Sequence, residues 1–302
     1  MVSEGLTLTA CQLCPRNCKV NRESGQKGYC HETAELVVGR AALHHWEEPC
    51  ISGTKGSGAV FFSGCTMGCV FCQNHILSKG DAGKALSIER LAEIFIELQN
   101  QEAHNINLVT PTHYTLQITE ALTIAKKHGL TIPIIYNCSG YEKVETLRLL
   151  EGLVDVYLPD FKYYSEDLAK KYSKAPRYFE YASMAIAEMV RQVGKAQFNE
   201  EGMIQKGVIV RHLLLPGGLI DSKAVVRYLY ETFGDSIWLS LMNQYTPLEH
   251  VADYPELNRK VTRRAYNRLI DFALALGVEN GFIQEGETAK ESFIPLFNGE
   301  GI

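Results

Sequence analysis

Three cysteines lie within eight residues of the chain, directly behind a short apolar run. Their spacing, Cys65-x3-Cys69-x2-Cys72, allows three thiolates of one loop to hold three irons of a [4Fe-4S] cube, with no fourth cysteine close by for the last iron. An open coordination position is typical of a catalytic metal centre, whereas a structural zinc knuckle would need a fourth protein ligand. Inert buried thiols would have no reason to adopt this spacing. We therefore expect a cluster whose free iron binds a small molecule.

A second group of cysteines lies near the amino terminus and consists of Cys11, Cys14, Cys18 and Cys30. Four thiolates within twenty residues form a closed ligand set, which suits either a [4Fe-4S] cluster or tetrahedral zinc. The segment has little apolar sequence of its own, so a bound metal would supply its folding energy. We favour an auxiliary iron-sulfur cluster; structural zinc and a disordered tail with reducible thiols are the alternatives.

The elements that must position these cysteines follow a repeating pattern. Apolar runs rich in valine and isoleucine alternate with segments of helical periodicity, which predicts successive βα units. The expected strands are residues 59–62, 106–109, 132–136, 154–158, 207–215 and 237–242. The expected helices are residues 87–99, 115–128, 144–150, 181–193, 222–232 and 255–276. Several of the strands are almost continuously apolar, as parallel strands covered by helices are.

This pattern predicts an α/β fold, a partial (β/α)6 TIM-like barrel with a cysteine-rich N-terminal extension. A full eight-stranded barrel is the alternative, but the residues before 59 do not resemble a βα repeat. We expect residues 1–50 to form the metal-binding extension, 51–285 the barrel and 286–302 a C-terminal tail. Functional loops of such barrels follow the carboxyl ends of the strands, and the loop with Cys65 lies there.

Polar residues follow the other expected strands as well. They are Thr110, Thr112 and His113 after the second, Asn137 and Ser139 after the third, and Asp160 and Lys162 after the fourth. Such residues can bind a ligand at the rim of the barrel. The alternative for Thr112 is a helix cap, and the alternative for Asp160 and Lys162 is a structural ion pair.

The last two strands and one further cysteine add candidates for the same rim. Arg211 and His212 lie inside an otherwise apolar strand, and a charge buried there needs a partner, so one of them should face the barrel interior. A satisfied histidine in the barrel wall is the alternative for His212. Asn243, Gln244 and Tyr245 follow the sixth strand. Cys138 could donate a hydrogen atom or bind a second metal, although a small buried cysteine is the commoner case.

The motif around Cys65, Cys69 and Cys72, with the aromatic Phe71 before its third cysteine, resembles that of the radical S-adenosylmethionine (SAM) superfamily. The resemblance implies that SAM chelates the open iron and is cleaved reductively to methionine and a 5′-deoxyadenosyl radical. It also implies SAM contacts for the residues at the other strand ends. In many members a Gly-Gly-Glu segment receives the amino group of SAM; here Thr110, Thr112 and His113 occupy that place. Asp160 and Lys162 would contact the SAM carboxylate. The other implied contacts are Asn137, Ser139 and either Arg211 or His212.

The longer pattern resembles the branch of this superfamily that contains uncharacterised relatives of pyruvate formate-lyase-activating enzyme. The resemblance rests on residues 58–64, 105–114, 157–163 and 211–217. It implies an oxidoreductase that abstracts hydrogen from a protein or peptide and receives electrons from a donor such as flavodoxin or ferredoxin. In this chain the additional cysteines precede the first motif, whereas in some members of that group they follow it. The alternatives are an enzyme that acts on a small metabolite and a non-catalytic electron carrier.

Composition sets broader limits on partners and location. The chain has 302 residues, a formal net charge of −5 and nine cysteines grouped at ligand spacings. An acidic balance gives no general attraction to nucleic acid, so we expect no nucleic-acid partner. The first residues do not resemble a secretory signal, and no apolar run approaches the length of a membrane span. We therefore expect a cytoplasmic protein with no membrane partner, whose cysteines bind metal instead of forming disulfides.

Overall fold

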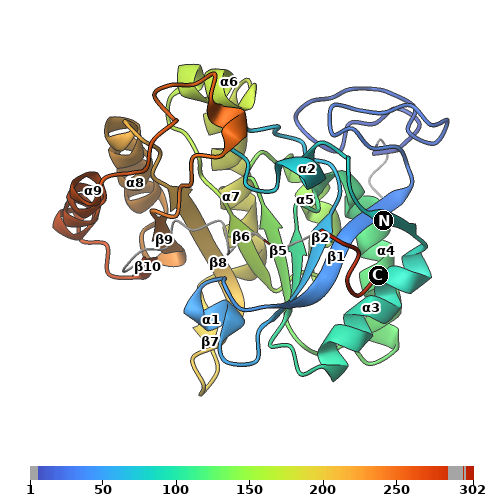
Figure 1. The fold of residues 1–302 in the computed structure, drawn as a ribbon. Coiled ribbons are helices and arrows are strands. Elements are labelled where there is room, and N and C mark those ends of the chain that lie inside the picture. Colours follow the sequence, from blue (N-terminus) through green and yellow to red (C-terminus); the bar gives the residue numbers. More distant parts are fainter. Residues whose placement is uncertain (1–5, 285–294, 296) are drawn as a thin grey trace.

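The computed structural model describes residues 6–284, 295 and 297–302 (Figure 1). Its strands are β1 (Leu36–His44), β2 (Ser57–Phe62), β3 (Lys84–Leu86), β4 (Ile106–Val109), β5 (Ile134–Cys138), β6 (Val156–Pro159), β7 (Gln197–Phe198), β8 (Ile204–Leu213), β9 (Trp238–Met242) and β10 (Gly281–Ile283). Its α-helices are α1 (Pro49–Ser52), α2 (His75–Ser78), α3 (Ile88–Asn100), α4 (Thr115–Lys127), α5 (Val144–Leu147), α6 (Glu166–Ser173), α7 (Tyr178–Val193), α8 (Leu219–Phe233) and α9 (Arg263–Leu276). Short 3-10 helices are η1 (Thr112–Tyr114), η2 (Arg148–Leu150), η3 (Gly234–Ser236) and η4 (Glu249–Val251).

The strands form one curved sheet in the order β10-β9-β8-β6-β5-β4-β2-β1-β3. Neighbours from β2 to β10 pair in parallel, whereas β1 pairs with both β2 and β3 in antiparallel fashion. Within the described residues β3 and β10 end this order without pairing to each other, so the barrel stays open. The structure therefore confirms the expected α/β fold, a partial TIM-like barrel with the cysteine-rich segment at its amino-terminal end.

Alternation along the strands separates two layers of packing. Tyr136 of β5 and Val210 of β8 pack into the large core beneath the helices, whereas their neighbours Ile135 and Ile209 face a smaller core on the other face of the sheet. Because successive side chains of a strand point to opposite faces, Arg211 shares the inner face with Ile209. This register brings a charged side chain to the inside of the barrel.

The expected strands are all present: β4 has the predicted bounds, and the ends of the others are shifted. β5 runs two residues further than predicted and ends at Cys138, so that Asn137 belongs to the strand. The prediction of a helix from residue 255 was wrong, because α9 starts at Arg263, where the hydroxyl of Thr262 caps the amide of Ala265 at 3.2 Å. Helix α6 and strand β1 were not predicted. Among the described residues, no helix has the length and apolar character needed to cross a membrane.

The division into extension, barrel and tail stays a prediction. Strand β1 lies within the predicted extension, yet it joins the sheet of the barrel through β2. Most of the predicted tail lies outside the described residues, and its described end returns to β1, where the amide of Ala41 donates a hydrogen bond of 2.9 Å to Glu300. Figure 1 shows this end of the chain beside β1.

Candidate active site

A cavity of about 260 Å³ lies at the carboxyl ends of the parallel strands. Its wall contains the cysteines of the loop after β2 and residues from the ends of β4, β5, β6 and β8. The predicted site residues in this wall are Cys65, Cys69, Cys72, Phe71, Thr110, Asn137, Ser139, Asp160, Lys162 and Arg211. Parallel strands present their carboxyl ends at one edge of the sheet, which explains how residues far apart in sequence reach one cavity.

The loop after β2 packs against the N-terminal cysteine segment. Gly64 has a φ of +81°, and a Cβ added there would lie 2.5 Å from the carbonyl oxygen of Cys30. Glycine is therefore required at this position, both for its backbone conformation and for the close approach of the two segments. The amide of Cys65 donates a hydrogen bond of 3.3 Å to the same carbonyl. The two cysteine groups are thus joined by a direct backbone contact.

The three thiols after β2 have the surroundings of metal ligands. Burial, together with the nearby thiols of Cys65 and Cys69, raises the pKa of Cys72 to about 12, so the bare thiol of Cys72 would stay protonated at neutral pH. Bound iron would hold it as a thiolate. Ser173 donates a hydrogen bond of 3.0 Å to Sγ of Cys69. No three cysteine, histidine or acidic side chains of the described residues are placed to chelate a single metal ion, so the ligand set is assigned from the spacing and the shared cavity.

Four charged side chains form a network in the wall of the same cavity. Asp160 accepts hydrogen bonds from Lys162 Nζ at 2.6 Å and from Arg211 Nε at 3.1 Å. Arg211 also pairs with Glu47 at 3.0 Å and donates to the amide oxygen of Asn137. Two cations and two carboxylates therefore balance each other in a largely buried site.

The electrostatics of this network follow from burial and pairing. Burial would raise the pKa of Asp160, but the adjacent Lys162 and Arg211 outweigh it and hold that pKa below its ordinary value. Burial likewise opposes the charge of Lys162, yet Asp160 raises the pKa of the ammonium above its ordinary value. Asp160 and Lys162 are therefore both charged at neutral pH. The cavity thus offers fixed positive and negative charges to a ligand that carries both signs.

Glu47 was not identified from the sequence. It lies between β1 and α1, and its Oε1 accepts hydrogen bonds from Asn107 at 3.0 Å and from Asn137 at 3.3 Å. Only the acidic pair before Pro49 marks it in the sequence, and nothing there shows that this segment reaches the inside of the barrel. The neighbouring Glu48 is also buried, and burial raises its pKa above its ordinary value.

Thr110 has an unusual backbone at the end of β4. Its φ of +59° lies in the left-handed region, which a β-branched residue adopts at a cost of order 1–3 kcal/mol. The amide of Thr110 donates a hydrogen bond of 2.9 Å to Asn137, which holds this conformation. Strain of this kind is typical of ligand-binding loops.

Three predicted site residues do not reach the cavity wall. Thr112 is buried and donates its hydroxyl proton to Glu142 at 2.7 Å. His113 Nε2 lies 2.6 Å from the carbonyl oxygen of Ser63, and burial lowers the pKa of this histidine to about 3. His212 faces away from Arg211 and lies 2.6 Å from the carbonyl oxygen of Phe161. These placements favour structural roles for all three.

The remaining candidates divide in the same way. Gln244 and Cys138 line the cavity, whereas Tyr245 is buried and donates to the carbonyl of Leu257 at 2.8 Å. The amide of Asn243 binds the side chain of Gln284 at 2.8 Å. Cys50 lies in α1 and packs in the small core on the inner face of the sheet, away from both cysteine groups.

The N-terminal cysteines are close to one another. A Cβ added at Gly28 would lie 3.6 Å from the sulfur of Cys18 and 3.6 Å from that of Cys30. Burial raises the pKa of Cys14 far above its ordinary value, and the neighbouring cysteines of the group add to the effect. A metal ion or cluster would relieve this cost by binding the thiolates. The donor set thus fits either zinc or an iron-sulfur cluster.

A buried arginine adjoins this cysteine group. Arg22 is 1% exposed, and its guanidinium donates to the carbonyls of Thr33 and His113 and lies 3.9 Å from the sulfur of Cys11. Among the described residues no carboxylate accepts a hydrogen bond from Arg22, although a buried cation normally needs an anionic partner. A metal bound by four thiolates carries negative charge and would supply that partner.

Known proteins share the sequence pattern and the fold. A sequence model of the Radical SAM superfamily matches residues 59–222, which are more than half of the chain. An uncharacterised protein of Methanocaldococcus jannaschii is 29% identical over 273 residues, which cover 87% of this chain and 74% of that protein. The residues matched by the superfamily model include the loop with Cys65, Cys69 and Cys72.

Two solved structures show a similar arrangement of elements. A radical SAM methyltransferase from Sphaerobacter thermophilus is 17% identical, with a TM-score of 0.53 over 76% of this chain and 66% of that one. SuiB from Streptococcus suis, solved bound to SAM, is 16% identical, with a TM-score of 0.51 over 73% of this chain and 48% of that one. The chain thus spans slightly less than two thirds of the first protein and about half of the second, and at these identities the likeness shows the fold alone. The match of the superfamily model over more than half of its length shows that this chain belongs to the radical SAM superfamily.

Proposed function

We propose that the protein holds a [4Fe-4S] cluster on Cys65, Cys69 and Cys72, binds SAM beside it and abstracts a hydrogen atom from a substrate. The observation that carries this proposal is that the three thiols and the network of Asp160, Lys162 and Arg211 line one cavity. When bound, the cluster supplies the electron that splits SAM into methionine and a 5′-deoxyadenosyl radical.

The charges of the cavity wall suit the charges of SAM. Lys162 provides a cation for the carboxylate of SAM, while Asn137 and Ser139 offer oxygen atoms to its amino group. Asp160 and Arg211 position Lys162 and Asn137 through hydrogen bonds. Because positively and negatively charged side chains are already fixed in the wall, burying a zwitterionic ligand here costs less free energy than in an apolar cavity.

We assign the N-terminal cysteines to a second metal site and favour an auxiliary iron-sulfur cluster over structural zinc. The contact between Cys30 and Cys65 supports a short route for electrons between the two groups. An external donor such as flavodoxin or ferredoxin would then supply the electrons. A zinc ion on the same cysteines would instead fix the segment against the cluster loop.

The substrate class has two candidates. The resemblance to activating enzymes favours a protein or peptide, whereas closure of the cavity favours a small metabolite. Arg16 ties the cysteine segment to the carbonyls of Thr66 and Met67 at 2.8 and 3.0 Å, and Pro295 lines the cavity from the other end of the chain. These contacts of the two chain ends with the cavity wall favour a small molecule or a short peptide segment. A non-catalytic electron carrier would not need the charged side chains that line this cavity.

The decisive test is anaerobic reconstitution with iron and sulfide, reduction with dithionite and addition of SAM. We expect 5′-deoxyadenosine from the wild-type protein and none from Cys72→Ala, while Cys50→Ala, a control for the loss of a cysteine elsewhere, keeps the activity. Product formation by Cys72→Ala would refute the proposal, as would its absence from fully loaded, reduced wild-type protein supplied with candidate substrates. About eight irons per chain would indicate an auxiliary cluster, and about four irons with one zinc a structural site.

A further inference from the structure

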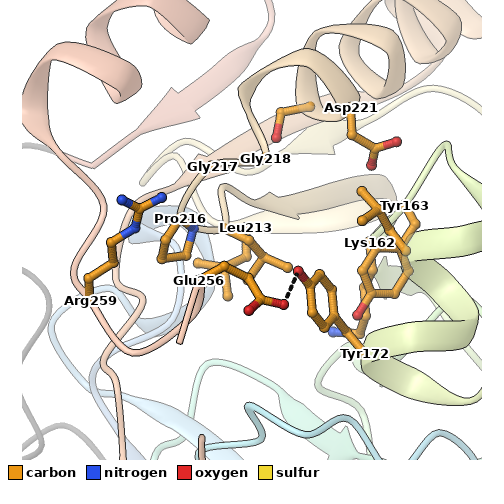
Figure 2. A pocket seen from close by; sticks show the side chains of 13 residues that line it. Lys162, Tyr163, Tyr172, Leu213, Pro216, Gly217, Gly218, Asp221, Glu256 and Arg259 are labelled. Atoms are coloured by element: carbon orange, nitrogen blue, oxygen red, sulfur yellow. Dashed lines mark hydrogen bonds between the residues drawn. The ribbon is translucent and has the colours of Figure 1, made fainter. Parts of the chain in front are cut away.

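A second pocket adjoins the SAM cavity on the side of β8. Its volume is about 160 Å³, and the two spaces share Lys162, Leu213 and Leu215 in their walls. Figure 2 shows the remaining wall, which includes Pro216 and the loop that leads into α8. A space of this size holds part of a ligand and not a whole drug-sized molecule, for which pockets of roughly 300–1,000 Å³ are usual. The pocket therefore suits one end of a molecule that extends into the SAM cavity.

The two carboxylates of this pocket are already engaged. Asp221 accepts hydrogen bonds from the backbone amides of Tyr164 and Ser165 at 3.1 and 2.7 Å. Glu256 accepts the hydroxyl proton of Tyr172 at 3.0 Å, as Figure 2 shows, and pairs with Lys171 at 2.6 Å. Neither carboxylate thus requires a positively charged group from a ligand.

The wall of this pocket contains two cations, Lys162 and Arg259. Lys162 pairs with Asp160 at 2.6 Å. Arg259 is exposed at the pocket wall, and among the residues that the structure describes its guanidinium forms neither an ion pair nor a hydrogen bond. Its NH2 group lies 3.5 Å from the position of a Cβ at Gly217, so the absence of a side chain there leaves the guanidinium accessible. In Figure 2 Arg259 and Lys162 lie at opposite ends of the pocket.

We propose that this pocket binds the carboxylate-bearing end of the substrate. The carboxylate pairs with Arg259, and the carbon chain passes Pro216, Leu213 and Leu215 toward the SAM cavity. Arginine is suited to this role because its planar guanidinium can donate two parallel hydrogen bonds to a carboxylate. The inference rests on the proposed function and narrows its substrate to an organic acid, either free or as an acidic residue of a peptide.

Binding of matched acid and amide probes tests the proposal. Equilibrium dialysis of the reconstituted protein with SAM would compare L-glutamate with L-glutamine, and N-acetyl-Gly-Glu-Gly-amide with its glutamine counterpart. We expect one of the acids to bind about 10-fold more tightly than its amide, as the loss of one charge-assisted contact predicts. Tighter binding of free glutamate identifies a small molecule as the source of the carboxylate, and tighter binding of the capped peptide identifies a peptide.

Two variants separate the pocket from general charge effects. Arg259→Gln should abolish the preference for the acid, whereas Arg268→Gln, which removes an exposed arginine of α9 outside the pocket, should keep it. The proposal is overturned if neither acid is preferred, or if the preference survives Arg259→Gln. The 5′-deoxyadenosine assay on the same samples tests the proposed function separately. A failure of the acid-binding proposal can therefore be distinguished from a failure of the proposed function.

Discussion

Replacing Asp160 by asparagine tests whether the charged network serves SAM or only the fold. The substitution keeps the shape of the side chain but leaves Lys162 and Arg211 without the carboxylate that lies 2.6 and 3.1 Å from them. Hydrogen bonds to charged groups contribute about 1.5–3 kcal/mol each, and the amide oxygen can still accept one of the two. We therefore expect the free energy of unfolding to fall by about 2–3 kcal/mol.

The control is an exposed ion pair of similar geometry. Arg90 and Glu97 pair at 2.5 Å on α3, but the side chain of Glu97 is 50% exposed, against 18% for Asp160. Exposed pairs contribute about 0.2–1 kcal/mol, so Glu97→Gln should have a smaller effect. Urea unfolding of both variants at neutral pH measures the difference. Because its neighbours hold the pKa of Asp160 below its ordinary value, the difference should persist as the pH falls to about 4 and shrink only below it.

A role of the network in SAM binding is tested by two further measurements. If Lys162 contacts the SAM carboxylate, Asp160→Asn should weaken SAM binding at least 10-fold, a change of about 1.4 kcal/mol, while iron per chain stays near the wild-type value. Equilibrium binding of SAM and metal analysis on one sample would show this. Equal loss of iron and of SAM affinity would assign the network to the structure of the barrel. Destabilisation no larger than that of Glu97→Gln would refute the claim that the network is a buried one.

Three further predictions concern the buried groups around the cysteine segment. Arg22→Met should lower the metal bound by the N-terminal site, while Arg22→Lys, which keeps the charge, should lose less; equal metal content in all three proteins would contradict the role of this cation. Burial raises the pKa of Glu142 to about 8. Between about pH 4 and 8 the folded chain therefore holds a proton that the unfolded chain has lost. The stability of the wild type should fall as the pH rises through this range. Glu142→Gln should therefore stabilise the protein more at pH 8 than at pH 5 in urea unfolding, and a gain independent of pH would refute this. Cys14→Ser should remove the second metal but leave the iron on Cys65, Cys69 and Cys72, which metal analysis would show.

Much of the fold could be predicted because it depends on local patterns. Apolar runs and helical periodicity located every strand from β2 to β9 that pairs in parallel, since covered parallel strands are apolar throughout. Strand β1 was missed because it pairs in antiparallel fashion and follows the N-terminal cysteine segment in sequence. The start of α9 was misplaced because the residues before Thr262 have no pattern that distinguishes a loop from a helical turn.

The sequence by itself predicted the two groups of cysteines as ligand sets, because cysteines within one short segment are kept close together by the chain. It also determined which loops meet at the carboxyl edge of the sheet. Only the tertiary structure decided that Glu47 reaches Arg211, that His113 and His212 face away from the cavity, and that a pocket with Arg259 opens beside Lys162. These facts depend on the register of strands and on contacts between distant segments, which spacing along the chain does not encode.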